Sequence, residues 1–136
     1  MGLATAKLLA SRGAIVSMAD INQALLKTGR DSLTGSDKHI HTVVDVRDSG
    51  QVESWIQSTV QKLGKLDGAV NMAGVISPAT PITETTDETW NFNFAVNSTG
   101  LFYCLRAQLK AMGAGGSIVS HCLLVGLCNA ADLETL

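Results

Sequence analysis

The chain has 136 residues, enough for one domain, of which 46% are hydrophobic and 16% charged. This balance is typical of a folded globular protein and excludes intrinsic disorder, which requires low hydrophobicity and high charge. Twelve acidic and ten basic residues give a net charge of -2, so we expect neither nucleic acid nor an acidic membrane surface as a partner.

No segment of the sequence resembles a membrane span or a secretion signal. The apolar run at residues 122–131 is far shorter than the roughly 18 residues that cross a bilayer. Lys7 interrupts the N-terminal segment where a secretion signal would be apolar. The cysteines, Cys104, Cys122 and Cys128, form no CxxC pair and are expected to be buried and reduced. We therefore expect a cytoplasmic protein without a membrane partner.

Helix and strand patterns alternate along the chain. Apolar residues at helical spacing predict helices over residues 2–12, 22–32, 48–63 and 86–112, the last with an interruption near Asn93. Short apolar runs predict strands over residues 14–19, 40–46, 66–72 and 117–122. Asn22 and Asp48 are suited to cap two of the helices. Strands that alternate with helices predict a parallel α/β sheet with both faces covered.

In a parallel α/β sheet, ligands bind at the carboxyl ends of the strands. The residues predicted at those ends are Asp20, Asp45, Val46, Asn71, Ala73, Gly74 and 120–122. An acid such as Asp20 can accept hydrogen bonds from both ribose hydroxyls of an adenosine, and its charge repels a 2′-phosphate. Ala73 and Gly74 would let a ligand approach the backbone, and the Asn71 amide could join neighbouring strands. Helix capping and turn formation explain the same residues equally well at this point.

Together these motifs resemble the short-chain dehydrogenase/reductase family. The first ten residues are similar to the helix that follows the family's TGxxxGxG loop, and Gly2 matches the last glycine of that loop. Residues 71–74 (NMAG) differ by one residue from the family's NNAG or NAAG, and residues 90–102 are similar to the helix that carries the catalytic Asn, here Asn97. The resemblance covers residues 2–119. It implies an incomplete Rossmann-like, doubly wound parallel sheet, in one partial dinucleotide-binding domain at residues 1–136.

The resemblance implies hydride transfer between a nicotinamide cofactor and an alcohol or carbonyl substrate. Asp20 matches the ribose-binding acid of NAD-preferring members, so the implied cofactor is NAD rather than NADP. Asp45 and Val46 resemble the pair that flanks the adenine. The further residues implied to bind the dinucleotide are Gly2, Asn71, Ala73 and Gly74. Because family members form dimers and tetramers through the helix that matches residues 93–112, a homo-oligomer through this helix is a further expectation.

Three departures from the family pattern predict that the chain is inactive as it stands. The family's first strand and leading glycines have no counterpart, which would weaken dinucleotide binding. When residues 116–126 are aligned on their terminal glycines, Leu123 occupies the position of the catalytic Ser. The one tyrosine, Tyr103, is followed by Ala107 where a YxxxK motif requires Lys. Of the family's Ser, Tyr, Lys and Asn, only Asn97 remains. Residues 123–136 form an atypical tail.

Three functions therefore stay open: a fragment of an NAD-dependent oxidoreductase, a non-catalytic nucleotide-binding module, and a chain that caps a longer homologue. The strands at residues 14–19 and 66–72 would share the missing first strand as their partner. We therefore expect two unpaired strand edges, and an isolated chain that is unstable or aggregates unless the two strands pair directly. His39 and His41 are interpreted as solvated residues rather than metal ligands. No metal site is expected, and Trp55 is predicted to lie in the core.

Overall fold

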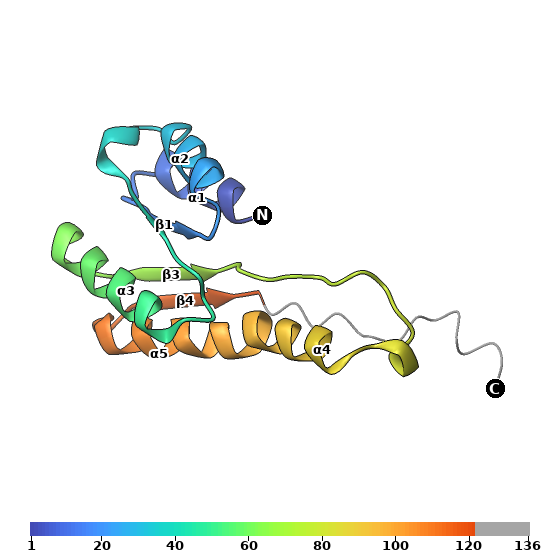
Figure 1. Cartoon of the computed structure of the whole chain (residues 1–136). Helices are drawn as coiled ribbons and strands as arrows, with labels where there is room; N and C mark the ends of the chain where they lie inside the picture. The colour runs from blue at the N-terminus through green and yellow to red at the C-terminus, as the bar shows by residue number, and fades with distance from the viewer. Residues whose placement is uncertain (122–136) are drawn as a thin grey trace.

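The computed structural model describes residues 1–121, in which helices and strands alternate (Figure 1). The strands are β1 (Ser17–Asp20), β2 (Ile40–Val43), β3 (Gly68–Asn71) and β4 (Ser117–Ser120). The α-helices are α1 (Gly2–Ser11), α2 (Gln23–Asp31), α3 (Ser49–Leu63), α4 (Asp87–Phe94) and α5 (Leu101–Ala111). Two 3-10 helices, η1 (Ser36–Lys38) and η2 (Ile82–Glu84), lie in loops, and a π-helical segment, η3 (Ala95–Gly100), joins α4 to α5. The predicted helices and strands are present, and each strand is shorter than predicted.

Local sequence explains where α2 and α3 begin and end. Asn22 Oδ1 accepts a backbone N–H of α2 at 3.1 Å. Asp48 Oδ1 accepts the N–H groups of Gly50 and Gln51 at 2.8 and 3.1 Å, and these hydrogen bonds hold the pKa of the Asp48 carboxyl below its ordinary value. α3 ends at Gly64, whose φ of 85° lies in the left-handed region that favours glycine. Both predicted N-caps are therefore confirmed.

The helix break predicted near Asn93 is wrong, because a π-helical segment, η3, continues the helix there. Phe94, Gly100 and Leu101 at its junctions all keep right-handed helical φ and ψ angles. α4, η3 and α5 therefore form one continuous helix. A π-helical turn accommodates an extra residue within a helix and is often found at functional sites.

The strands form two separate parallel pairs. β1 pairs with β2, with Ser17 opposite Ile40, and β3 pairs with β4, with Gly68 opposite Ser117. Within residues 1–121, no strand joins β1 to β3. The two unpaired strand edges expected from the sequence are therefore present.

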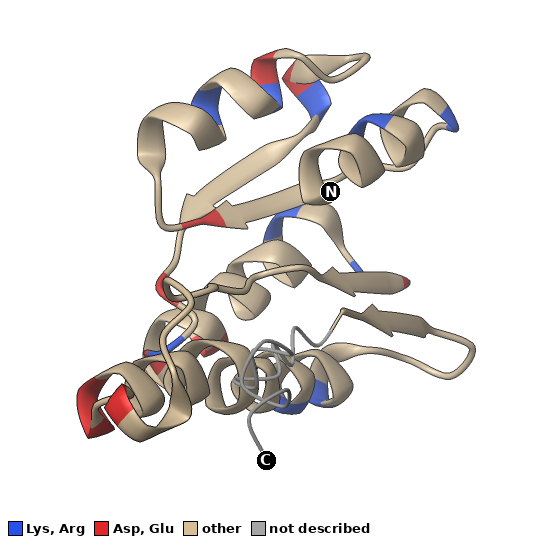
Figure 2. Ribbon diagram, turned by 90° about the vertical axis from the view of Figure 1, so that its right-hand side faces the viewer, with Lys and Arg blue, Asp and Glu red and all other residues tan. Residues whose placement is uncertain are grey.

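α1 and α2 lie beside the β1–β2 pair, while α3 and α5 pack together on one side of the β3–β4 pair (Figures 1 and 2). The other face of the β3–β4 pair is open within residues 1–121, since Val70 and Val119 are 39% and 55% exposed, so the prediction of a sheet with both faces covered is not met there. α1 packs on β1 through a small cluster of Ala6, Ala10 and Leu33, with Val16 and Met18 at its edge. The larger core cluster consists of Val44, Val52, Ile56, Cys104 and Ala107. Ala19 of β1 and Leu66, just before β3, both pack against this larger cluster, as does the half-buried Trp55. The core beneath the sheet thus holds the two strand pairs together.

His39 corrects one expectation, because it is buried and not solvated. Its side chain is 5% exposed, and Nδ1 accepts the N–H of Val16 at 3.0 Å. Nε2 therefore carries the proton and donates to the carbonyl of Thr34, which lies 3.0 Å away. Burial of the ring is tolerated because both nitrogens have main-chain partners. His41, by contrast, is half-buried at the surface of β2.

Cys104 is buried in the larger core cluster as expected, and burial raises the pKa of its thiol to about 11. Cys122, Cys128 and Leu123 lie outside the described residues.

In the part of the chain that the structure describes, no group of three His, Cys, Asp or Glu side chains could hold a metal ion. None of the helices within residues 1–121 is long and apolar enough to cross a membrane.

Candidate functional site

Several of the predicted site residues meet at the carboxyl edge of the strands. The carbonyl of Asp20, at the end of β1, accepts the N–H of Val44, which follows β2, at 3.0 Å. Gly2 begins α1 beside the end of β3, since a Cβ added to Gly2 would lie 3.6 Å from the Cβ of Met72. The start of α1 and the ends of three strands therefore lie at one side of the molecule (Figure 1).

Val46 is held at this edge by close packing against η3. A Cβ added to Gly100 would lie 2.8 Å from Cγ2 of Val46 and 3.2 Å from its carbonyl oxygen. Only a residue without a side chain allows this approach without displacement of Val46. The segment after β2 thus packs directly on the helical turn that carries Asn97.

Asn97 joins the same helix to the loop after β3. Its Oδ1 accepts the N–H of Val75 at 2.9 Å, and its Nδ2 donates to the carbonyl of Val75 at 2.9 Å. This double hydrogen bond fixes the loop that begins with Ala73 and Gly74. Asn97 is therefore bonded to the residue that directly follows Ala73 and Gly74.

The Asn71 side chain is bonded within the core. Its Nδ2 donates to Gln108 Oε1 at 2.9 Å and to Ser120 Oγ on β4 at 3.2 Å. Gln108 Nε2 donates in return to Asn71 Oδ1 at 2.7 Å, and Gln108 is only 1% exposed. The prediction that Asn71 joins neighbouring strands is confirmed. Its amide is engaged by protein partners, so a ligand at this edge would meet the Asn71 backbone.

The Asp20 carboxylate is oriented by one hydrogen bond and open to a second partner. Oδ1 accepts the N–H of Asn22 at 2.9 Å, while Oδ2 has no hydrogen-bond partner among residues 1–121. The residue is exposed at the end of β1. One carboxylate oxygen can therefore accept hydrogen bonds from a ligand without loss of an existing contact.

The Asp45 carboxylate is already paired with Arg47, a residue that sequence analysis did not single out. Arg47 Nη2 donates to Oδ2 at 2.5 Å and Nε to Oδ1 at 2.9 Å. These hydrogen bonds lower the pKa of Asp45 and raise that of Arg47. The pair therefore stabilises the fold above the ordinary carboxyl pKa, and this contribution is lost as the pH falls. The Arg47 guanidinium carbon also lies 5.5 Å from the Phe92 ring centroid, so Arg47 contacts both Asp45 and Phe92. A ligand that binds the Asp45 carboxylate must therefore displace Arg47 from these two contacts.

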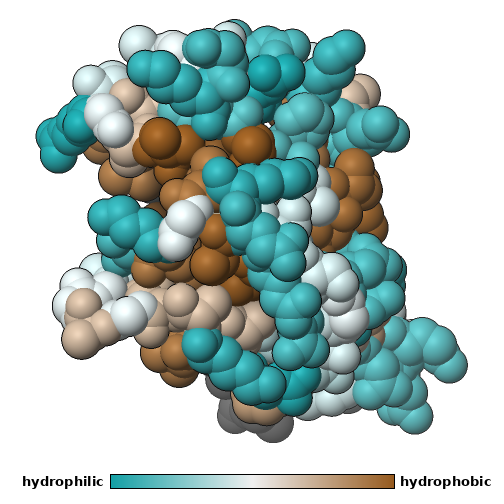
Figure 3. All heavy atoms as spheres, turned by 90° about the vertical axis from the view of Figure 1, so that its left-hand side faces the viewer, coloured by the Kyte–Doolittle hydropathy of each residue, from teal (hydrophilic) through white to brown (hydrophobic). Residues whose placement is uncertain are grey.

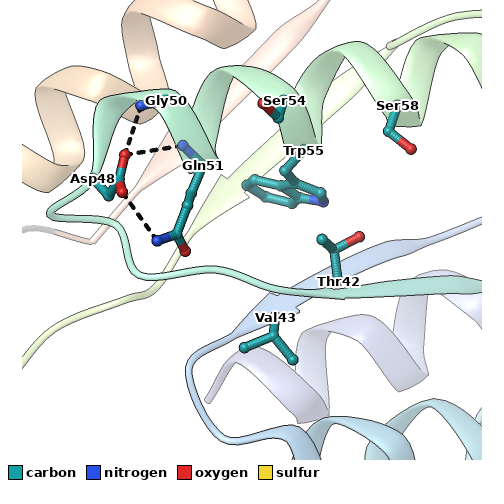
Figure 4. Close-up of a pocket in the computed structure, with 8 residues that line it drawn as sticks. All are labelled: Thr42, Val43, Asp48, Gly50, Gln51, Ser54, Trp55 and Ser58. Carbon is teal, nitrogen blue, oxygen red and sulfur yellow. Dashed lines mark hydrogen bonds between the residues drawn. The ribbon is translucent and has the colours of Figure 1, made fainter.

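A pocket of about 540 Å³ lies between β2 and α3, where Trp55 stands between the two elements (Figure 4). Its other lining residues are Thr42, Val43, Asp48, Gly50, Gln51, Ser54 and Ser58. None of these is a predicted site residue, and the Asp48 and Gln51 side chains are bonded to each other at 3.0 Å. The pocket adjoins the candidate site through Gln51, whose Oε1 accepts the N–H of Asp45 at 3.0 Å.

A family model described as "Enoyl-(Acyl carrier protein) reductase" matches residues 1–132. The chain belongs to the short-chain dehydrogenase/reductase family. Short-chain dehydrogenase/reductase aba4 of Botryotinia fuckeliana is 44% identical over 137 residues, which cover 96% of this chain and 53% of that protein. Chanoclavine-I dehydrogenase easD of Claviceps purpurea is 38% identical over 121 residues, which cover 82% of this chain and 46% of that protein.

Solved structures of short-chain dehydrogenases/reductases have the same fold. Levodione reductase superposes with a TM-score of 0.83 at 30% identity, covering 88% of this chain and 48% of that one. A short-chain dehydrogenase from Mycobacterium smegmatis gives a TM-score of 0.80 at 33% identity, covering 88% and 51%. The Rossmann-like fold predicted from the sequence is confirmed, and the chain spans about half the length of the curated relatives it matches.

The structure thus places the predicted site residues of this short-chain dehydrogenase/reductase chain in two groups. At the carboxyl edge, Gly2, Asp20, Ala73 and Gly74 are exposed, and Val46 is half-buried against Gly100. Asp45, Asn71 and Asn97 lie at the same edge, but their side chains are bonded to the protein. Tyr103 packs against the larger core cluster, with its ring centroid 5.2 Å from the Arg106 guanidinium carbon.

Proposed function

We propose that this chain provides the adenosine-binding part of an NAD-dependent oxidoreductase, which transfers hydride between a nicotinamide and an alcohol or carbonyl. The observation that supports the proposal is that Gly2, beside Met72 after β3, and Asp20 and Val46, at the ends of β1 and β2, all lie at the carboxyl ends of the strands. Asp20 would accept hydrogen bonds from the ribose hydroxyls, and Val46 would flank the adenine. The start of α1 at Gly2 would face the pyrophosphate, because a helix N-terminus presents unpaired N–H groups.

The proposal assigns binding, and not turnover, to the chain as it stands. Of the residues that carry the family's chemistry, only Asn97 has a match, and its role would be to support a proton-relay water. A phenol must have its pKa lowered from about 10 to act as an acid/base near neutral pH. Tyr103 has no Lys at the fourth position after it, and Leu123 offers no hydroxyl where the family has Ser.

Asp20 makes NAD the proposed cofactor. A 2′-phosphate would bring a charge of about -1.5 to -2 next to the carboxylate, which repels it.

Phe102 and Leu109, which are 54% and 65% exposed on α5, offer apolar contacts for the homo-oligomer expected through residues 93–112, which stays a prediction.

The Asp20→Asn substitution tests the cofactor assignment. The amide retains the acceptor for the Asn22 N–H but loses the charge, so we expect NADH binding to weaken about tenfold and the preference for NADH over NADPH to disappear. Dissociation constants for both nucleotides, measured by titration calorimetry, check this. Asp37→Asn, at an exposed acid in η1, is the matched control and should change neither constant. An unchanged ratio of the two constants in Asp20→Asn would refute the role of Asp20.

A further inference from the structure

The pocket between β2 and α3 carries an inference beyond dinucleotide binding. Its volume of about 540 Å³ lies in the range of roughly 300–1,000 Å³ that is usual for small-molecule sites. β2 forms one wall and α3 the other, so most of its lining residues are held on regular structure (Figure 4). Figure 3 shows a different side of the molecule, where apolar side chains lie across the middle between more hydrophilic upper and lower parts. The pocket differs from that surface because polar groups line it.

The carboxylate and amide groups of the pocket are already bonded within the protein. Asp48 Oδ1 accepts two N–H groups at the start of α3, and Asp48 Oδ2 accepts Gln51 Nε2 at 3.0 Å. Gln51 Oε1 accepts the N–H of Asp45 at 3.0 Å. Among the lining residues within 1–121, Asp48 is the one charged side chain, and none is Lys, Arg or His. The lining therefore favours a neutral ligand over an anion.

Three hydroxyl groups of the lining, by contrast, have no hydrogen-bond partner among residues 1–121: those of Thr42, Ser54 and Ser58. Ser54 and Ser58 are four residues apart and so lie on the same face of α3. A helical hydroxyl can donate to the carbonyl four residues earlier, as that of Thr28 does at 3.0 Å, but neither serine does so. Figure 4 shows the Thr42 side chain on the side of β2 that faces α3. Both walls therefore offer hydroxyl groups, each of which can donate and accept.

Trp55 adds an aromatic surface to the same pocket. Its indole N–H donates to Ser17 Oγ at 3.0 Å, so the ring is fixed and its one polar atom is engaged. The side chain lines the pocket and lies between α3 and Thr42 of β2 (Figure 4). What Trp55 offers a ligand is therefore the carbon surface of its ring, which can cover the C–H groups of a ligand of similar width.

We propose that this pocket binds a neutral, hydroxylated six-membered ring of the size of a monosaccharide. The ring packs against Trp55, and its hydroxyl groups bond to those of Thr42, Ser54 and Ser58. A hydrocarbon ring would take water from these three side chains without replacing its hydrogen bonds, so it is rejected. None of these four residues belongs to the proposed dinucleotide site, so the proposal does not depend on NAD binding.

The indole N–H signals of the ¹⁵N-labelled full chain test the proposal. Trp55 lines the pocket, and Trp90, on α4, lies outside its lining and is the internal control. The probe is methyl β-D-glucopyranoside. We expect a saturable shift of the Trp55 signal with a dissociation constant of about 1 mM, and no shift of the Trp90 signal. Tetrahydropyran, a six-membered ring without hydroxyl groups, should shift neither signal.

Two variants remove the hydroxyl groups of one wall each. Ser54→Ala with Ser58→Ala should weaken glucoside binding about tenfold, and Thr42→Val about threefold to fivefold. Both should fold, because Ala favours a helix more than Ser does and Val suits a strand. Gln57→Ala, at an exposed position of α3 outside the lining, is the matched control and should leave the dissociation constant unchanged.

Four results would overturn the proposal. They are no saturable shift of the Trp55 signal with the glucoside, equal shifts of the two indole signals, an equal response to tetrahydropyran, and unchanged affinity in both hydroxyl variants. A loss of affinity in Gln57→Ala as large as that in the serine variant would place the ligand elsewhere on α3 and would overturn it as well.

Discussion

Replacement of Gln108 by Leu is expected to lower the free energy of unfolding by about 2–3 kcal/mol. Gln108 is 1% exposed, and its amide exchanges two hydrogen bonds with the Asn71 amide. Leu fills a similar volume, so packing changes little. However, Asn71 Oδ1 loses its donor in a buried site, and an unmet buried polar group costs far more than the net value of one hydrogen bond. Urea unfolding followed by circular dichroism measures the loss.

A double variant separates the polar cost from a packing effect. Asn71→Leu with Gln108→Leu removes both amides, so most of the stability should return, and the two substitutions should not be additive. Gln61→Leu, at an exposed position of α3, is the control and should change stability by less than about 0.5 kcal/mol. A Gln108→Leu variant as stable as the original chain would contradict this account of the pair.

The second large effect is expected at Gly100. The Gly100→Ala substitution should destabilise the chain by about 1–2 kcal/mol, although Ala favours a helix by about 1 kcal/mol over Gly. The added Cβ would lie 2.8 Å from Cγ2 and 3.1 Å from Cβ of Val46, which is too close for either residue to keep its place. Because displacement moves Val46 from the strand edge, NADH binding should weaken as well. Thermal unfolding and calorimetric titration measure the two effects.

Gly113→Ala provides the matched control, because a Cβ at Gly113 would meet no atom within 4 Å. Val46→Ala removes Cγ2 and should restore part of the stability of Gly100→Ala. If Gly100→Ala instead stabilises the chain, the helix preference outweighs the contact, and Val46 is not held by η3 as described.

Features set by local sequence could be predicted. Asn22 and Asp48 cap helices through bonds to residues two or three positions away, and Gly64 ends α3 through its own backbone conformation. The family motifs likewise occupy short segments, so Asp20 and Asn97 could be proposed as site residues from the sequence, and their roles stay predictions. The unpaired edges of β1 and β3 could be predicted because, in the fold that the sequence resembles, both strands pair with a first strand that no segment of this sequence matches.

Features set by long-range contacts could not be predicted. His39 is buried because Val16, 23 residues away, needs an acceptor, and Gln108 is buried because Asn71, 37 residues away, needs a partner. A lone His or Gln in a helix or strand pattern gives no sign of such a partner. Arg47 was overlooked although its main partner, Asp45, is only two residues away, and this short spacing is a signal that could have identified the pair. Only its contact with Phe92 depends on how α4 packs.

The central claim is that the carboxyl edge of the strands binds the adenosine part of NAD. The most direct measurement is the change in amide chemical shifts of the ¹⁵N-labelled chain on titration with NADH and with AMP. Our account predicts saturable changes at Gly2, Asp20, Val46 and Gly74 with both ligands. Changes confined to the pocket around Thr42 and Trp55, or no saturable change with either ligand, would contradict it.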